Sequence, residues 1–348
     1  MRLAERPLRS LEDVESFEAV PLEERIRGLR RTYDVIARGA VRYGDAPAFA
    51  FVPEGDHDLP EKNISYRELF VRVTRAANLF HARGIGPGDV VAYMLPNRIE
   101  THVTLWAAET AGVACAIGMT LEAEQIASIL VAAGAKVLVT VGPSWGNNVW
   151  QKVLAARALA KHVETLVLVG EHEDLAPDVL SFDRALASQR AGSLCSAREI
   201  DGDDVAYIFD AGGTASAPRL AQHTHRSEIV DALCTAWAVG MRSSDSIVCG
   251  LPFFHLNGVI VTGLAPMLAG ARLVLLGAAS LASARPLGGR SAGVPLPYQQ
   301  RRTAQLDANE SFVRDCCLVD EIGTIAIRGP NVFPDDVHGH PSVQWVLR

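Results

Sequence analysis

The sequence has no excess of basic residues. It holds 33 lysines and arginines against 40 aspartates and glutamates, a formal net charge of -7 over 348 residues. Proteins that bind duplex nucleic acid usually present a basic face or stripe. The nearest approach to one here is the short pair Arg301-Arg302. We therefore expect no nucleic-acid partner.

The cysteines are not arranged as a disulfide framework. None of the six stands in a Cys-x-x-Cys, and several lie in apolar runs, which is typical of reduced, buried thiols in a cytoplasmic protein. The first twenty residues mix both charge signs and have no apolar core, so we expect no signal peptide. The longest uncharged run, 246–271, contains two prolines, which favours a buried strand, loop and helix over a membrane span.

Short apolar strands alternate with helical segments from residue 47 onward. Ser65, with Glu68 three residues later, is typical of a capping box and begins a helix expected over 66–82. Further elements are expected at 48–52, 90–95, 99–111, 113–117, 122–133, 137–141, 147–160, 165–169, 203–209, 247–250, 273–276 and 321–328. Such alternation predicts a parallel sheet covered by helices on both faces.

The pattern predicts an α/β fold of stacked, mostly parallel sheets flanked by helices. We expect a first α/β subdomain over residues 1–180 and a second over 181–281. The composition changes near residue 278 to alanine, serine, glycine, proline and arginine without a clear period. We therefore assign residues 282–348 to a small β-rich remnant and tail.

A glycine-rich segment, 210–219 (DAGGTASAPR), follows the apolar strand expected to end at residue 209. Small residues let backbone N–H groups approach an anion closely, and hydroxyl groups add donors. Arg219 supplies a planar cation suited to phosphate. Composition alone fits a flexible surface loop equally well, and the Gly-Lys-Ser/Thr of a Walker A loop is absent.

Several motifs together resemble the AMP-forming acyl-CoA synthetases, the adenylate-forming or AMP-binding family. The family's phosphate loop reads about Thr-Gly/Ser-Gly-Thr-Thr-Gly-x-Pro-Lys, often followed by His-x-His, and a Leu-Pro-Leu-Phe-His-x-x-Gly motif comes later. Here His223-x-His225 and the run 251–258 (LPFFHLNG) stand in that order. Further matches lie at 65–69, 88–92, 95–100 and 321–333. The resemblance covers residues 40–277 continuously and 290–333 less tightly.

The resemblance implies a two-step ligation. A carboxylate attacks the α-phosphate of ATP and releases pyrophosphate, and the thiol of coenzyme A then attacks the acyl-adenylate. It implies ATP, Mg²⁺ and coenzyme A as cofactors and a fatty or aryl carboxylate as substrate. The nucleotide-binding residues would be Gly212, Gly213, Thr214, Ala215, Ser216 and Arg219.

The catalytic residues implied are Arg219, at the position of the family's lysine, and His255, at the junction of the nucleotide and acyl sites. His255, Asn257 and Gly258 would bind the acyl group and coenzyme A. No protein metal ligand is assigned. The alternative for His255 is a buried core histidine satisfied by backbone groups.

The chain also departs from the family's pattern. Ala215 removes a hydroxyl donor, and Ser216 adds a Cβ that costs on the order of 1 kcal/mol if φ must be positive. The family's Tyr-Gly-x-Thr-Glu segment has no counterpart between residues 276 and 295, and its Thr-Gly-Asp is missing after Phe333. Only 15 residues follow Phe333, where the family has a small domain with a catalytic lysine. We expect a truncated or internally deleted member that forms no acyl-CoA at a useful rate alone.

Other functions are weighed against this one. The run 142–146 (GPSWG) fits a hydrolase nucleophile elbow with Ser144 as nucleophile, but the adjacent Pro143 lacks the N–H that an oxyanion hole needs. A catalytically inactive nucleotide- or acyl-binding chain, or a decayed fragment, is the main alternative. The pairs His223-x-His225 and 338–340 (HGH) lack the remaining ligands of a metal set. A homo-oligomer is left open.

Overall fold

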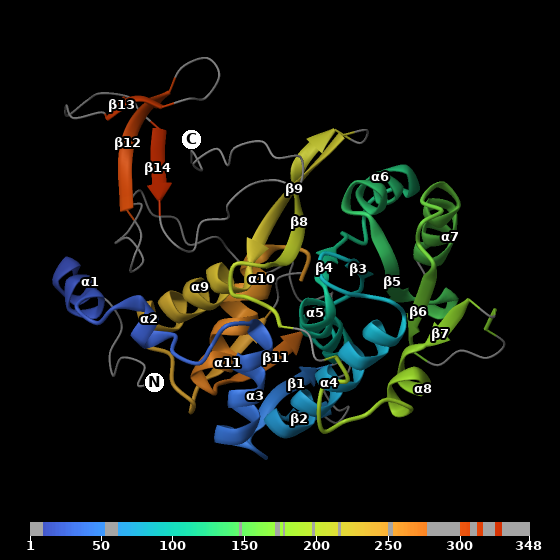
Figure 1. Ribbon diagram of the computed structural model, residues 1–348, viewed down its shortest axis with the longest axis horizontal. Helices are drawn as coiled ribbons and strands as arrows, with labels where there is room; N and C mark the ends of the chain where they lie inside the picture. Colours follow the sequence, from blue (N-terminus) through green and yellow to red (C-terminus); the bar gives the residue numbers. More distant parts are fainter. Residues whose placement is uncertain are drawn as a thin grey trace.

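In the computed structural model, the described residues form three sheets, with helices packed around two of them (Figure 1). It describes residues 10–52, 62–145, 148–170, 175–176, 178–196, 199–214, 217–249, 253–276, 300–306, 312–315 and 324–328. The α/β class with a mostly parallel sheet, expected from the sequence, is confirmed.

The largest sheet has seven strands in the order β7-β6-β5-β3-β4-β8-β9. All neighbouring pairs are parallel except β8 and β9, which are antiparallel. The strands are β3 (Val90–Met94), β4 (Val113–Ala116), β5 (Ala135–Val141), β6 (Thr165–Val169), β7 (Val179–Ser181), β8 (Val205–Thr214) and β9 (Ala217–Thr224). The inner strands β3 and β4 are fully buried, which explains their unbroken apolar sequences.

A second sheet pairs strands from near the start of the chain with strands that lie about two hundred residues later. Its order is β10-β11-β1-β2, with β1 parallel to β11 and antiparallel to β2. The strands are β1 (Pro47–Val52), β2 (Lys62–Ser65), β10 (Ser246–Cys249) and β11 (Arg272–Leu276). A third, antiparallel sheet has the order β13-β12-β14, formed by β12 (Gln300–Leu306), β13 (Phe312–Asp315) and β14 (Thr324–Arg328).

Helix α5 (Ile99–Ala111) lies at the centre of the core and has almost every residue buried. It packs against α3 and α4 and contacts strands of the large sheet, while its His102 ring touches Phe49 of β1. The other helices are α1 (Leu11–Glu18), α2 (Leu22–Arg25), α3 (Thr32–Tyr43), α4 (Tyr66–Ala82), α6 (Ala123–Ala133), α7 (Val149–Leu159), α8 (Phe182–Ala187), α9 (His225–Ala238), α10 (Leu256–Val259) and α11 (Ala265–Ala269). The described residues also include the single-turn 3-10 helix η1 (Pro143–Trp145) and the π-helix η2 (Ile260–Leu264).

The predicted start of α4 is confirmed, although only one half of the expected capping box forms, because the Glu68 carboxylate accepts a hydrogen bond from Arg72 instead. The Glu68 N–H donates a hydrogen bond to the Ser65 side chain at 3.1 Å, so Ser65 is the N-cap. The described residues of the run 246–271 form β10, α10, η2 and α11, a strand followed by helices as expected, but only Cys249 of β10 is buried. In the part of the chain described here, no helix is both long and apolar enough to cross a bilayer.

The proposed boundary between residues 180 and 181 stays a prediction. Strands β8 and β9 follow this boundary but belong to the same sheet as β3, β4, β5 and β6. Strands β1 and β2 precede it but pair into the sheet of β10 and β11. Each of the two larger sheets therefore combines segments from both proposed subdomains.

Candidate nucleotide and acyl site

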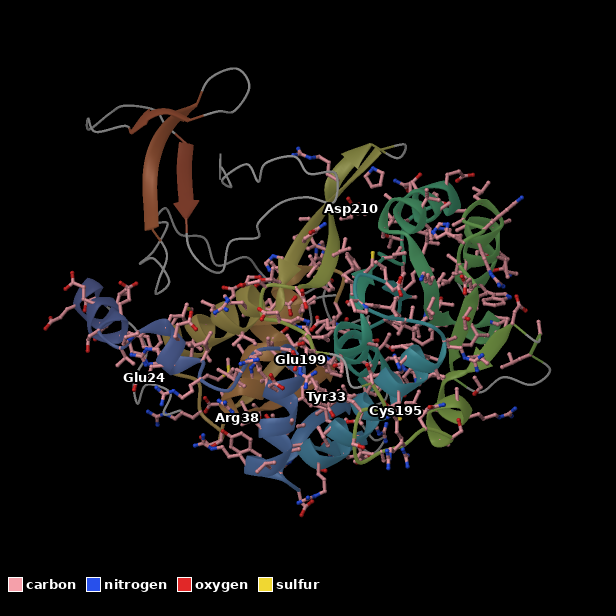
Figure 2. The ribbon with its side chains drawn as sticks, viewed as in Figure 1. Glu24, Tyr33, Arg38, Cys195, Glu199 and Asp210 are labelled. Carbon is pink, nitrogen blue, oxygen red and sulfur yellow. The ribbon has the colours of Figure 1, made fainter. Side chains whose placement is uncertain are left out.

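The glycine-rich segment forms the end of a β-hairpin. The sequence pattern ended the strand at Phe209, and this was wrong: β8 continues to Thr214 and pairs with β9 from Ala217. Backbone hydrogen bonds to β9 keep the segment extended without apolar side chains, so hydropathy alone could not reveal the strand. Figure 1 shows the hairpin projecting beyond the neighbouring strands, and Figure 2 places Asp210 on its upper part.

A β-bulge interrupts the pairing within this hairpin. Asp210 pairs with Leu220 and Gly213 with Pro218, so two residues of β8 face one residue of β9, Arg219. Bulges bend a strand and redirect its side chains, and they are common next to active sites. Arg219 is exposed and makes no hydrogen bond or ion pair to any residue that the structure describes. The predicted phosphate-binding cation is therefore presented to solvent at a bulge.

The hairpin rises from the edge of the sheet where ligands of α/β proteins bind. β8 is parallel to β4, and β4 is parallel to β3, so their carboxyl ends lie at one edge. In open parallel sheets the ligand crevice lies outside this edge. Gly212, Gly213 and Thr214 belong to the end of β8 at that edge. Ala215 and Ser216, which were also predicted to bind nucleotide, lie outside the described residues.

His255 is exposed, so it is not the buried core histidine weighed as its alternative. It is the N-cap residue of α10, and its carbonyl oxygen accepts hydrogen bonds from the N–H groups of Gly258 at 2.9 Å and Val259 at 3.3 Å. Asn257 is exposed as well, whereas Gly258 is buried. The motif thus presents a histidine and an amide side chain to solvent from one short helix.

Two buried tyrosines tie this motif to the strands below it. The Tyr93 hydroxyl of β3 donates a hydrogen bond to the Phe253 carbonyl oxygen at 2.7 Å, and the Tyr207 hydroxyl of β8 donates to the same oxygen at 3.3 Å. Gly118, just after β4, lies against the Phe254 ring. The segment leading to His255 therefore lies at the carboxyl ends of β3 and β4 and beside the first half of β8. No hydrogen bond or ion pair joins Arg219 to His255 among the described residues.

The histidines between the hairpin and α9 are buried. His223 forms a hydrogen bond through Nδ1 with the Ser227 hydroxyl at 3.3 Å, and burial lowers the pKa of its imidazole to about 4. His225 accepts the Thr32 N–H at Nδ1, at 3.3 Å. Within the described ranges, no three His, Cys, Asp or Glu side chains gather as metal ligands. The part of the chain that the structure describes therefore offers no set of side chains for a protein-held Mg²⁺, and we derive no step through the metal.

A pair of buried acids between α5 and α9 was not predicted from the sequence. Glu109 of α5 and Glu228 of α9 are fully buried, and burial raises the pKa of both carboxyl groups. The charge of Glu228 raises the pKa of Glu109 further, while the hydrogen bond from Thr32 opposes this. Charged residues usually indicate surface positions, so no signal in the sequence identified the pair.

Comparison with known proteins shows the family of this chain. Residues 36–288 match the family model described as AMP-binding enzyme. The chain belongs to the AMP-binding enzyme family. A curated family relative, the marinolic acid–CoA ligase of Pseudoalteromonas sp. (strain SANK 73390), is 30% identical over 276 residues, which are 78% of this chain and 41% of the relative. The crotonobetaine/carnitine–CoA ligase of Citrobacter koseri is 29% identical over 251 residues, or 72% of this chain and 46% of the relative.

Solved structures show the same fold. The anthranilate CoA ligase AuaEII in complex with anthranoyl-AMP superposes with a TM-score of 0.75 at 15% identity, covering 91% of this chain and 73% of that one. A long-chain-fatty-acid–CoA ligase of Archaeoglobus fulgidus gives 0.72 at 19% identity, covering 88% and 76%. The chain spans less than half the length of the two curated relatives named above. The comparisons do not favour the hydrolase interpretation of Ser144, which lies in the exposed turn η1.

Proposed function

We propose that this chain binds ATP and a carboxylate as the large domain of an ATP-dependent acid–CoA ligase. The observation that carries the proposal is the β8–β9 hairpin, which bears a Gly-Gly-Thr end and an exposed Arg219 at the carboxyl edge of a parallel sheet. Backbone N–H groups on small residues and a planar cation are suited to phosphate. Membership of the AMP-binding family gives the same assignment.

The proposed roles follow the sequence motifs. Gly212, Gly213 and Thr214 would hold the phosphates, together with Ala215 and Ser216, and Arg219 would neutralise charge as pyrophosphate leaves. His255 would lie where the carboxylate meets the α-phosphate. Asn257 and Gly258 would line the passage for the acyl group and for coenzyme A. The chemistry needs the carboxylate oxygen and the departing pyrophosphate held in line.

A fatty or aryl carboxylate is the proposed acyl donor. The relatives and structures named above are ligases of marinolic acid, crotonobetaine or carnitine, anthranilate and long-chain fatty acids, so the family accepts acids of very different size. Coenzyme A is the proposed acceptor, and Mg²⁺ would accompany the ATP phosphates. The described cysteines are all free thiols, which suits the proposed cytoplasmic location.

Calorimetry with ATP and Mg²⁺ tests the nucleotide site directly. We expect micromolar binding by the wild-type chain and weaker binding by Thr214→Ala, which loses a hydroxyl donor at the hairpin end. Thr165→Ala, at the start of β6, is the matched control and should bind like the wild type. No binding at millimolar ATP would instead support a decayed fragment.

Pyrophosphate release with a panel of carboxylates then separates binding from catalysis. Release that depends on one class of acid, fatty or aryl, would identify the substrate. ATP binding without release in the presence of any acid of the panel would support the alternative of a catalytically inactive, nucleotide-binding chain. The chain spans 41% of the length of one relative and 46% of another. ATP binding without pyrophosphate release is therefore an outcome that this assay should test directly.

A further inference from the structure

We infer that Tyr93 and Tyr207 are positioning residues that fix His255 by holding the carbonyl group of Phe253. The inference rests on the proposed function of His255. The two tyrosines lie on strands that are neighbours of β4 on either side, so they approach each other across one strand. Neither belongs to any motif by which the sequence resembles its family.

The hydrogen bonds converge on a single acceptor. Tyr93 donates to the Phe253 oxygen at 2.7 Å and Tyr207 at 3.3 Å, and the two hydroxyl oxygens are 3.4 Å apart. A carbonyl oxygen has two lone pairs, and here two separate donors use them. Both rings are buried, so water cannot replace either hydroxyl without a rearrangement. Burial raises the pKa of each tyrosine well above its usual value, which keeps both groups protonated as donors.

The ring of Phe253 is fixed as firmly as its carbonyl group. It packs edge-on against the His102 ring with centroids 4.0 Å apart, and the other neighbour of His102 is Phe49, at 4.3 Å. His102 is fully buried, and burial lowers its pKa to about 3, so it packs as a neutral ring. Phe253 is thus held by an aromatic stack on one side and two hydroxyl groups on the other.

Two residues further on, the chain reaches solvent. His255 is exposed and begins α10, and its ring lies 4.5 Å from that of Phe254. Phe253 and Phe254 belong to neither a strand nor a helix, and the backbone hydrogen bonds of α10 begin only at the His255 carbonyl oxygen. The tyrosine hydroxyls orient the backbone that precedes it. Through Tyr207 they also link it to β8, the strand that ends in the phosphate-binding hairpin.

Tyr→Phe substitutions test the inference because they remove only the hydroxyl group. Tyr66→Phe is the matched control: its buried hydroxyl donates to the Ala271 carbonyl oxygen at 2.7 Å, the same bond type in another part of the fold. The first readout is the NMR signal of the His255 imidazole in protein labelled with ¹³C-histidine, assigned by its loss in His255→Gln. We expect Tyr93→Phe and Tyr207→Phe to move this signal and Tyr66→Phe to leave it in place.

The second readout is ATP–pyrophosphate exchange driven by the carboxylate. Misplacement of a reacting group by about 1 Å costs up to about 100-fold in rate, so we expect kcat to fall about tenfold to 100-fold in the two site variants. The KM for ATP should change by less than about twofold, because both substitutions leave the Gly-Gly-Thr end of β8 and Arg219 of β9 unchanged. A loss that appears equally in Tyr66→Phe would overturn the positioning role.

The two proposals fail in different ways. If the wild-type chain shows no exchange, the proposed activity is wrong for this chain, and the NMR comparison still decides the positioning role. If the His255 signal is unmoved in both site variants, the positioning role is wrong whatever the activity. If thermal unfolding shows that Tyr93→Phe does not fold, Tyr207→Phe decides, since it removes the longer of the two bonds.

Discussion

The Thr32 hydroxyl donates a 2.6 Å hydrogen bond to the carboxyl group of Glu109, 77 residues further along the chain. This bond joins α3 to the buried centre of α5, where Glu109 interacts with Glu228 of α9. Three helices from distant parts of the sequence therefore meet at one acidic pair. Figure 2 labels the neighbouring Tyr33 on the same helix as Thr32.

This acidic pair predicts a pH dependence of stability. Burial raises the pKa of Glu228 above the ordinary value of 4.5, so the folded chain keeps a proton that the unfolded chain releases. The stabilisation is complete below about pH 4.5 and is lost as the pH rises through the folded pKa, by about 1.4 kcal/mol per pH unit for one proton. Glu228→Gln should therefore gain stability relative to the wild type between about pH 5 and about pH 8.

Urea unfolding at several pH values measures this difference. Glu124→Gln, on the exposed side of α6, is the control. Its free energy of unfolding should differ from that of the wild type by the same amount at each pH. If the free energies of unfolding of Glu228→Gln and the wild type differed by the same amount at every pH tested, the prediction would be wrong.

Arg219 is predicted to contribute to ATP binding through its charge. A hydrogen bond to a charged group contributes about 1.5–3 kcal/mol, so Arg219→Ala should weaken ATP binding about tenfold to 100-fold. Arg219→Lys keeps the charge and should bind within about fivefold of the wild type. Arg67→Ala, which removes an exposed partner of Asp45, serves as the control. Equal affinities of Arg219→Ala and Arg67→Ala by calorimetry would exclude Arg219 from the phosphate site.

Substitution of alanine for Gly112 should lower the stability of the protein much more than the same substitution at Gly134. A Cβ at Gly112, between α5 and β4, would lie 2.3 Å from the Asp89 carbonyl oxygen, and this overpacking should cost about 3 kcal/mol. Gly134 ends α6 at a φ of +65°, with nothing within 4 Å of the added carbon, so Gly134→Ala should cost only about 1 kcal/mol. Chemical unfolding measures both, and similar losses would show that the close contact at Gly112 relaxes.

Ser144 should not react as a hydrolase nucleophile. It is exposed, but no hydrogen bond from a described histidine reaches its hydroxyl, and the preceding Pro143 offers no N–H. A fluorophosphonate probe should label the wild type no more than Ser144→Ala. Selective labelling that disappears in the variant would establish the hydrolase alternative.

Local signals in the sequence predicted much of the fold. Helix α5 and strand β6 have the bounds expected from hydropathy, and Ser65 correctly marked the start of α4. The second sheet could not be predicted in this way. Its β1 pairs with β11, which lies more than two hundred residues away, and no periodicity encodes such a pairing.

The candidate site was only partly visible in the sequence. Glycines, a threonine and Arg219 pointed to phosphate because those residue types have that chemistry, but the β-bulge that presents Arg219 depends on the register with β9. Tyr93 and Tyr207 stand in strands that look uniformly apolar. Their importance comes from the distant Phe253 carbonyl group, which only the folded chain brings to them.

The pairing of β1 with β11 also has a consequence for how the chain emerges from the ribosome. Phe49 pairs with Leu273, so at about 5–20 residues per second β1 leaves the exit tunnel about 10–45 s before its partner exists. During that interval β3, β4 and β5 can already assemble, while the apolar Phe49 and Phe51 have no neighbouring parallel strand. Slow translation prolongs this exposure, and recombinant yield should therefore rise with co-expressed chaperones that bind nascent apolar segments.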